Sequence, residues 1–359
     1  MKQSRQYEGL AADPECQDSR INRAASWSVT VYSILTLGAV ITICLTFRDM
    51  VTGPESEPQP QSDQDPTLIA ELLQPICKTP SQRQEWRQLN ATEKTGYIDA
   101  VKCLHSQPSA RHPYGQLSDD FPWAYRSNAH FASDAAPFLP WHRYFIHVYE
   151  TALKESCGYT GHLPYWDWTL DWEDPAKSAI WDPETGFGGD GASNNMKIGS
   201  CVDSGPFSDY QILYSDLAIK PHCLSRGFGR HNESGVFEGK WFSPEVVKQI
   251  SLEHNFFNFS MALKAGPYNN MSNQVGGDFL SFDAPNDPVS FLHYAQLDRL
   301  WWMWQKDHPQ NSTEYNGPKN GDSNAMASLL DVLPMYGLSR DTPVSDVIDT
   351  QSGLLCYKY

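Results

Sequence analysis

The sequence lacks any cluster of lysine and arginine residues. Its 359 residues contain 27 Lys and Arg against 43 Asp and Glu, which gives a formal net charge of −16. Nucleic acids and anionic lipid surfaces bind through clustered positive charge, so the composition argues against both as ligands of the domain surface. A glycine-rich phosphate loop, a CxxC pair and a GxSxG turn are also missing from the sequence, and with them the usual signatures of nucleotide, dithiol and serine-hydrolase chemistry.

One long apolar run stands near the N-terminus. Residues 27–47, from Trp27 to Phe47, are 21 residues without a charge, which is the length that a helix needs to cross a bilayer. A cleaved signal peptide is the alternative, but the run is longer than a typical signal core and ends without a small-residue cleavage pattern. Two arginines closely precede it and one follows. The sequence therefore predicts a single-pass membrane protein, with residues 1–26 in the cytosol and the large domain luminal or extracellular.

The chain after this run has the features of a secreted domain. Five N-x-S/T sequons follow the run and none precedes it; they begin at Asn90, Asn232, Asn258, Asn270 and Asn311. Six of the eight cysteines also follow it: Cys77, Cys103, Cys157, Cys201, Cys223 and Cys356. Sequons are used only in the secretory lumen, where an even number of cysteines is consistent with up to three disulfides. The pairing stays open, although Cys356 is expected to fasten the C-terminal tail.

Composition divides the rest of the chain into a stem and one domain. Residues 48–67 are rich in Pro, Gln, Asp and Ser, which predicts an extended tether because such a segment buries little apolar surface. Residues 68–359 show no internal repeat and suit one large domain. Helical patterns are clearest at Pro66–Leu73, Ala91–Leu104, Trp141–Cys157, Ser243–Leu252 and Val289–Lys306. Long loops rich in Gly, Asp and Ser separate them, so we expect a mainly α fold.

Three motifs in this order carry a resemblance to a known family. They are PFLPWHRYFIHVYE (137–150), GPYNNMSNQVGG (266–277) and NDPVSFLHYAQLDRLWWMWQ (286–305). Together they resemble the copper A and copper B regions of the tyrosinase and hemocyanin type-3 copper superfamily. PYWDW (164–168) and HCLSRGF (222–228) resemble its fungal tyrosinase-like branch. The resemblance implies a four-helix-bundle core, a pair of copper ions, and a setting in fungal secondary-metabolite biosynthesis.

The residues at the expected copper-ligand positions do not match that family. The resemblance implies two copper ions, each held by three neutral imidazoles, which suit copper. The six positions in this sequence are Tyr125, Ser133, His142, Tyr268, Ser272 and Tyr294. Only His142 is a histidine, and phenol and hydroxyl groups of high pKa replace imidazole poorly at neutral pH. We therefore expect no cofactor; copper is implied by the family alone.

Other histidines and the tryptophans near these motifs have simpler interpretations. A mononuclear site from His142, His130 and a carboxylate is an alternative, whereas His147 lies off the face of His142. His293 should face away from the position of Tyr294, because adjacent helical residues point about 100° apart. Aromatic residues at helical spacing, such as those near Trp301, are more often core than a ligand site.

Three hypotheses about function remain. The first is a membrane-anchored tyrosinase-like protein without ordinary phenol oxidase activity, which acts as an accessory or scaffold beside a protein partner. The second is a non-redox acid–base enzyme for a small phenolic or peptidic substrate, in which Tyr125, Tyr268 and Tyr294 converge in the former metal cavity. The third is a copper-dependent phenol oxidase, which the missing ligands contradict.

Overall fold

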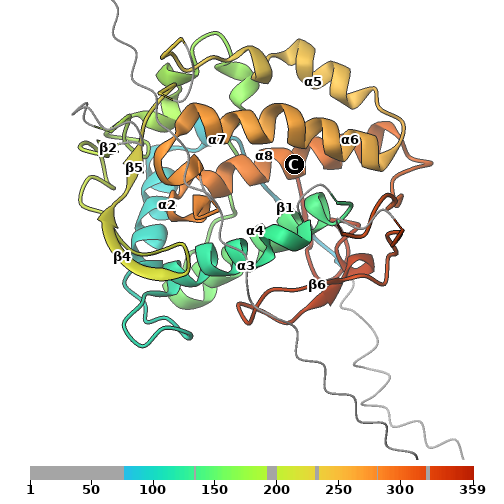
Figure 1. Ribbon diagram of the computed structural model, residues 1–359, viewed down its shortest axis with the longest axis horizontal. Helices are drawn as coiled ribbons and strands as arrows, with labels where there is room; N and C mark the ends of the chain where they lie inside the picture. The colour runs from blue at the N-terminus through green and yellow to red at the C-terminus, as the bar shows by residue number, and fades with distance from the viewer. Residues whose placement is uncertain (1–76, 133–134, 192–199, 231–233, 281, 321–323) are drawn as a thin grey trace, which may run out of the picture. The chain divides into compact units, whose positions relative to one another are not determined.

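The computed structural model describes residues 77–132, 135–191, 200–230, 234–280, 282–320 and 324–359, without the side chains of 129–132 (Figure 1). The predicted tail (1–26), membrane span (27–47) and stem (48–67), and the helix predicted at Pro66–Leu73, lie outside these residues. Among the described residues, no helix combines the length and apolar character that crossing a membrane requires. The predicted span therefore stays a prediction.

Four helices form the core of the domain: α2 (Ala91–Leu104), α3 (Asp120–Ala132), α4 (Phe138–Cys157) and α8 (Val289–Asp307). Helix α4 packs against each of the other three, and Figure 1 shows it together with α8 at the centre of the domain. Of α8, 13 of 19 residues are buried, so this helix has almost no solvent face. The mainly α fold is confirmed.

Local sequence explains where the core helices begin and end. Asn90 and Glu93 form a capping box at the start of α2, where each side chain accepts a hydrogen bond from the other's backbone N–H. Helix α4 ends at Gly158, which adopts a left-handed conformation with φ of 64° that glycine tolerates without strain. Signals of this kind make helix boundaries predictable.

Three shorter helices cover the core, namely α5 (Pro244–Ser251), α6 (Phe256–Leu263) and α7 (Asn269–Val275). The predicted helix at Ala91–Leu104 matches α2, and those at 141–157, 243–252 and 289–306 match α4, α5 and α8 to within three residues. Helices α3, α6 and α7 were not predicted. Between α6 and α7 the chain forms a π-helix, Lys264–Tyr268, with Gly266 and Pro267 inside it; this pair interrupts the helical pattern in the sequence.

The remaining elements are short. The described strands form two-stranded pairs: β1 (Ser81–Gln82) with β8 (Tyr357–Lys358), β2 (Ser200–Cys201) with β5 (Ser225–Arg226), β3 (Gln211–Ser215) with β4 (Ala218–Cys223), and β6 (Val332–Leu333) with β7 (Thr342–Pro343). The 3-10 helices are Trp86–Gln88, Leu117–Asp119, Trp168–Leu170, Pro175–Lys177, Ala179–Trp181, Lys240–Phe242, Gly277–Leu280, Ala284–Asn286 and Val344–Asp346. Long loops join these pieces, as the sequence predicts.

All six cysteines after the predicted span form disulfides. The pairs are Cys77–Cys356, Cys103–Cys157 and Cys201–Cys223. The first fastens the C-terminal tail beside β1, which confirms the expectation for Cys356. The second joins the C-terminal ends of α2 and α4.

A buried ionic cluster fastens the tail to the helices. Asp298 of α8 accepts hydrogen bonds from the Nε of Arg143 at 2.5 Å and from the hydroxyl of Tyr357 at 2.6 Å. The side chain of Arg83 lies 3.6 Å from the same carboxylate and bonds Glu150 at 2.7 Å. This cluster therefore joins α4, α8 and both ends of the domain without any metal.

Candidate functional site

The structure brings Tyr125, Tyr268 and Tyr294 together in the middle of the core. Tyr125 comes from α3, Tyr268 from the π-helix and Tyr294 from α8. The hydroxyl groups of Tyr125 and Tyr268 are hydrogen-bonded to each other. The ring of Tyr125 also stacks on that of Tyr294, with the centroids 5.7 Å apart and the planes 12° apart. The three aromatic side chains thus pack together at positions where the resemblance of the motifs places imidazole ligands.

An irregular turn of backbone directs Tyr268 into this centre. Gly266 has φ of −85° and ψ of −107°, outside the helical region, and Pro267 has no backbone N–H to donate. The side-chain amide of Asn270 donates to the carbonyl of Gly266 at 2.8 Å and so satisfies part of the interrupted helix. Single-turn π-helices of this kind occur frequently at functional sites. Ser272, one turn beyond Tyr268, is half-buried.

His142 lies beside the tyrosines, and its Nε2 has no hydrogen-bond partner among the described residues. It is buried on α4, and its ring packs against Tyr268 and Tyr294 with centroid distances of 5.5 and 4.9 Å. Its Nδ1 lies 2.7 Å from the carbonyl oxygen of Phe138. A carbonyl only accepts hydrogen bonds, so Nδ1 carries the proton and Nε2 presents a lone pair. Burial lowers the pKa of His142 to about 4, and the ring is neutral at pH 7.

His293 lies in the same centre, so the expectation that it faces away from the ligand position is wrong. The side chain is completely buried, and its ring packs against Tyr268 and Tyr294 with centroid distances of 6.1 and 5.8 Å. Adjacent residues of α8 can both contact this centre because α8 is buried on nearly all sides and the ring of Tyr268 packs against both His293 and Tyr294. The indole of Trp168 donates to Nδ1 of His293 at 3.2 Å. Burial, together with nearby His142, lowers the pKa of His293 to about 3.

These residues do not fit a pair of copper ions. A copper ligand must present a lone pair, and His142 Nε2 does so. The free nitrogen of His293 does not, because its Nδ1 accepts a hydrogen bond and its Nε2 therefore carries the proton. Burial raises the pKa of Tyr125, Tyr268 and Tyr294 well above the usual value, so all three are neutral phenols. Across the described ranges, no three His, Cys, Asp or Glu side chains come together as metal ligands.

His147 and His130, the other histidines considered in the sequence analysis, do not add a described side chain to this centre. His147, half-buried on α4, stacks against Tyr144, away from the three tyrosines. The side chain of His130 and the whole of Ser133 lie outside the described residues. The alternative mononuclear site that uses His130 therefore stays a hypothesis.

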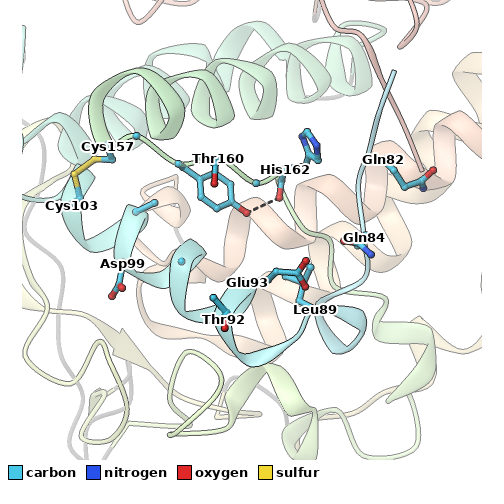
Figure 2. Close-up of a pocket in the computed structure, with 15 residues that line it drawn as sticks. Gln82, Gln84, Leu89, Thr92, Glu93, Asp99, Cys103, Cys157, Thr160 and His162 are labelled. Carbon is cyan, nitrogen blue, oxygen red and sulfur yellow. Dashed lines mark hydrogen bonds between the residues drawn. A yellow bond between two sulfur atoms is a disulfide. The ribbon is translucent and has the colours of Figure 1, made fainter. Parts of the chain in front are cut away.

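A separate surface cavity of about 680 Å³ lies between α2 and the loop after α4 (Figure 2). The disulfide Cys103–Cys157 borders it, and the hydroxyl of Tyr159 in its wall donates to the carbonyl of His162. Glu93, also in the lining, caps α2. The cavity is lined by side chains that water reaches, such as Gln82, Gln84 and Asp99. We therefore place the candidate site at the tyrosine–histidine centre, where Nε2 of His142 and Nε2 of His293 have no hydrogen-bond partner among the described residues.

The predicted glycosylation sites differ in exposure. Asn90 and Asn258 are exposed, whereas Asn270 and Asn311 are half-buried. The side-chain amides of Asn270 and Asn311 already donate to backbone carbonyls, at 2.8 and 2.6 Å. Asn232 lies outside the described residues. Glycosylation stays a prediction, and the geometry favours Asn90 and Asn258.

The helical core and the motif positions define a protein of the tyrosinase type. Comparison with known proteins gives the same class. Residues 83–307 match the family model described as the common central domain of tyrosinase. The chain belongs to the tyrosinase family, as the resemblance of its motifs implies.

The most similar relatives include fungal proteins. The chain is 37% identical to Tyrosinase ustQ of Aspergillus flavus, over 98% of this chain and 96% of that protein. It is 38% identical to Tyrosinase-like protein phomQ1 of Diaporthe leptostromiformis, over 92% of this chain and 86% of that protein. Among solved structures, a single-site mutant of a polyphenol oxidase from Thermothelomyces thermophila superimposes with a TM-score of 0.71 at 26% identity, covering 82% of this chain and 92% of that one.

Proposed function

We propose that this chain is a membrane-anchored member of the tyrosinase family that has lost the copper pair and ordinary phenol oxidase activity. It acts as an accessory or repurposed protein in a fungal secondary-metabolite pathway. The observation that carries the proposal is the direct hydrogen bond between the hydroxyls of Tyr125 and Tyr268. Both residues stand where the family resemblance places imidazole ligands, and they bond each other instead.

Physical chemistry supports the loss of oxygen chemistry. Binding dioxygen between two coppers requires imidazole lone pairs from several helices. Mutating a residue that only hydrogen-bonds a metal ligand typically lowers metal affinity or activity about 10–100-fold. Losing the ligands themselves should lower metal affinity further. Among the side chains that the structure describes, one imidazole lone pair, that of His142, lies in the centre. The phenols are neutral. To bind a metal as phenolates they would have to lose their protons, which is unfavourable because burial raises their pKa.

The sequence and its relatives support both the proposed biosynthetic pathway and the proposed location in the secretory membrane system. Similarity to ustQ and phomQ1, both from fungi, favours the pathway setting that the motifs imply. The apolar run at 27–47, the sequons after it and the disulfides among the described cysteines favour a single-pass protein with its domain in the secretory lumen.

A second candidate function is non-redox acid–base chemistry in the same centre. The observation that favours it is the Nε2 of buried, neutral His142, a base that has no hydrogen-bond partner among the described residues and has phenol groups beside it. A small phenolic or peptidic substrate would meet hydroxyl groups that both donate and accept hydrogen bonds. An accessory role predicts that His142→Phe leaves pathway output unchanged, whereas an enzymatic role predicts that product formation stops.

The test is the metal content and activity of the purified chain. The full-length protein is produced in a eukaryotic secretory host, loaded with copper or zinc, dialysed, and analysed by mass spectrometry for metal. We expect no tightly held metal, no oxidation of catechol, and a cooperative unfolding transition that copper does not shift. A stoichiometric copper pair with catechol oxidation would overturn the proposal and restore the phenol oxidase.

A further inference from the structure

The surface cavity between α2 and the loop after α4 has the size of a ligand site. Its volume of about 680 Å³ lies within the roughly 300–1,000 Å³ that is usual for small-molecule pockets. Figure 2 shows Leu89, Thr92 and Glu93 near the start of α2, at one end of the cavity. The disulfide between Cys103 and Cys157 lies at the other end. The cavity therefore has room for an occupant that the tyrosine–histidine centre does not involve.

The polar lining of this cavity favours a neutral occupant rich in hydroxyl groups. Amide and hydroxyl side chains, which both donate and accept hydrogen bonds, come from Gln82, Gln84, Thr92 and Thr160. Two carboxylates, those of Glu93 and Asp99, also line it, and no lysine or arginine does so among the residues that the structure describes. An anion would be repelled by these carboxylates. Sugar hydroxyls, in contrast, can donate to a carboxylate and exchange hydrogen bonds with amides.

An aromatic ring adds an apolar wall to the cavity. The ring of Tyr159 packs edge-on against that of Tyr97, with the centroids 5.7 Å apart. Its hydroxyl donates to the carbonyl of His162 at 2.9 Å, so the ring is held at both ends. A pyranose presents an apolar C–H face that packs well on an aromatic ring. An aromatic wall beside amides and carboxylates is therefore suited to a sugar.

A glycine in the middle of α2 leaves the backbone open to the cavity. Thr92, Gly96, Ala100 and Cys103 line the cavity and recur at the spacing of one helix face. A Cβ added to Gly96 would meet no atom within 4 Å, so packing does not demand a glycine here. Glycine weakens a helix interior relative to alanine. Its presence is explained if an occupant lies against this face of α2.

The sequon Asn90-Ala91-Thr92 lies at the same cavity. Thr92 lines it, and the exposed Asn90 caps the start of α2. The Oδ1 atom of Asn90 accepts from the backbone N–H of Glu93 at 3.0 Å, and the carboxylate of Glu93 accepts from the backbone N–H of Asn90 at 2.8 Å. Nδ2 of Asn90, the atom that an N-linked sugar would modify, makes no hydrogen bond with the described residues. A sugar on Nδ2 would therefore leave the helix cap intact.

We propose that Asn90 carries an N-linked glycan whose first sugars lie along α2 in this cavity, against Gly96 and Tyr159. The occupant of the cavity is thus a modification of the same chain. This inference rests on the secretory location proposed above, because N-linked sugars are transferred only there. It does not depend on the loss of copper.

The experiment compares two sequons of the full-length chain, produced in a eukaryotic secretory host that attaches high-mannose glycans. Mass spectrometry of glycopeptides gives the occupancy of each sequon. The folded protein is then treated with an endoglycosidase that cuts between the first two N-acetylglucosamines, and the rate of release at Asn90 is compared with that at Asn258. Asn258 is exposed on α6 and does not line the cavity.

A matched pair of variants separates docking in the cavity from simple shielding by the protein. Gly96→Leu places a side chain with good helix propensity in the open space. Thr95→Leu makes the same addition at an exposed position of α2 outside the lining. A docked glycan should be displaced by the first substitution and not by the second.

We expect Asn90 to be glycosylated and its glycan to be released at least about tenfold more slowly than that of Asn258, the factor of one good hydrogen bond. Gly96→Leu should remove the difference, and Thr95→Leu should preserve it. The inference is overturned by equal rates in the unchanged chain, by slow release that survives Gly96→Leu, or by an effect of Thr95→Leu as large as that of Gly96→Leu. An unmodified Asn90 beside other glycosylated sequons overturns this inference alone. Absence of sugar from all five sequons overturns the secretory location as well.

The stability of the protein gives an independent readout. Asn90→Asp keeps a good helix cap but removes the sugar. In this background Gly96→Leu should raise the urea midpoint, because a helix former replaces glycine. In the glycosylated chain the same substitution should lower the midpoint, because it displaces the sugar. An equal rise in both backgrounds would contradict docking in the cavity.

Discussion

The hydroxyl groups of Tyr125 and Tyr268 form a hydrogen bond across 143 residues of sequence at the centre of the helical core. Each hydroxyl is the other's partner. In contrast, the hydroxyl of Tyr294, whose ring stacks on Tyr125, makes no close hydrogen bond among the described residues and interacts only weakly with Tyr125 and Ser290. Removing the hydroxyl group should therefore change the free energy of unfolding by different amounts at the three tyrosines.

Replacing Tyr268 by Phe should destabilise the protein more than replacing Tyr294 by Phe. Tyr268→Phe leaves the buried hydroxyl of Tyr125 without its partner, which costs about 1–3 kcal/mol of unfolding free energy. Tyr294→Phe removes a hydroxyl that makes only weak interactions with Tyr125 and Ser290 and should cost much less. Urea denaturation of both variants gives the comparison. Equal losses in both would show that the hydrogen bond contributes little.

The convergence of these residues could be inferred from the sequence, but their hydrogen bonding could not. The motifs around His142 and Asn269 predict which residues stand at the expected ligand positions, and a shared fold then brings those positions together. By contrast, the tautomer of His293 depends on Trp168, 125 residues away. A contact of that kind depends on side-chain packing between distant segments, about which a single sequence carries no local signal.

Helix prediction succeeded for α2, whose start has a local cap, and failed for α6 and α7, between which the helical pattern is interrupted. The bounds of α2 follow from Asn90 and Glu93, which are close in the sequence and act locally. Helices α6 and α7 flank Gly266 and Pro267, which read as a helix break although the chain continues as a π-helix. The expectation for His293 failed for a related reason, because local geometry cannot tell that α8 is buried almost all round.

Removing the charge of Asp298 should destabilise the domain strongly. Asp298 and Arg143 are both completely or almost completely buried, and Asp298→Asn would leave the guanidinium of Arg143 in the core without its carboxylate. Loss of one partner of a buried pair typically costs about 3–5 kcal/mol. The matched control is Asp174→Asn, since Asp174 pairs with Lys177 at the surface and its loss should be undetectable. Chemical denaturation measures both, and a small effect of Asp298→Asn would mean that water reaches the cluster.

The pair of His222 and Asp278 should make stability depend on pH above neutrality. A hydrogen bond between the two side chains, at 2.8 Å, raises the pKa of His222 to about 9. A raised pKa means that the folded state binds the proton more tightly than the unfolded state, whose histidine titrates near its ordinary value of 6.5. The stabilisation is therefore complete below about pH 6.5 and is lost as pH rises through about 9.

Two measurements check this pH dependence. Titration of the ring by nuclear magnetic resonance should give a pKa near 9 for His222, and Asp278→Asn should return it toward the ordinary value. Denaturation of His222→Gln at several pH values should show a smaller decline between about pH 6.5 and 9 than the unchanged protein. If the stability of both proteins declined equally over this pH range, the pair of His222 and Asp278 would not contribute to the pH dependence.

Restoring histidine at five positions should restore metal binding if the fold has lost only its ligands. The variant carries Tyr125→His, Ser133→His, Tyr268→His, Ser272→His and Tyr294→His, with His142 unchanged. Because the ionic cluster around Asp298 holds α4 and α8 without a metal, the bundle should still fold and present six imidazoles toward one centre. Metal analysis after copper loading and dialysis should then find copper in the variant and none in the unchanged chain. Copper bound equally by both would place the metal outside these positions. A folded variant that binds none would show that the helices themselves have moved, so that the change in this chain extends beyond its ligands.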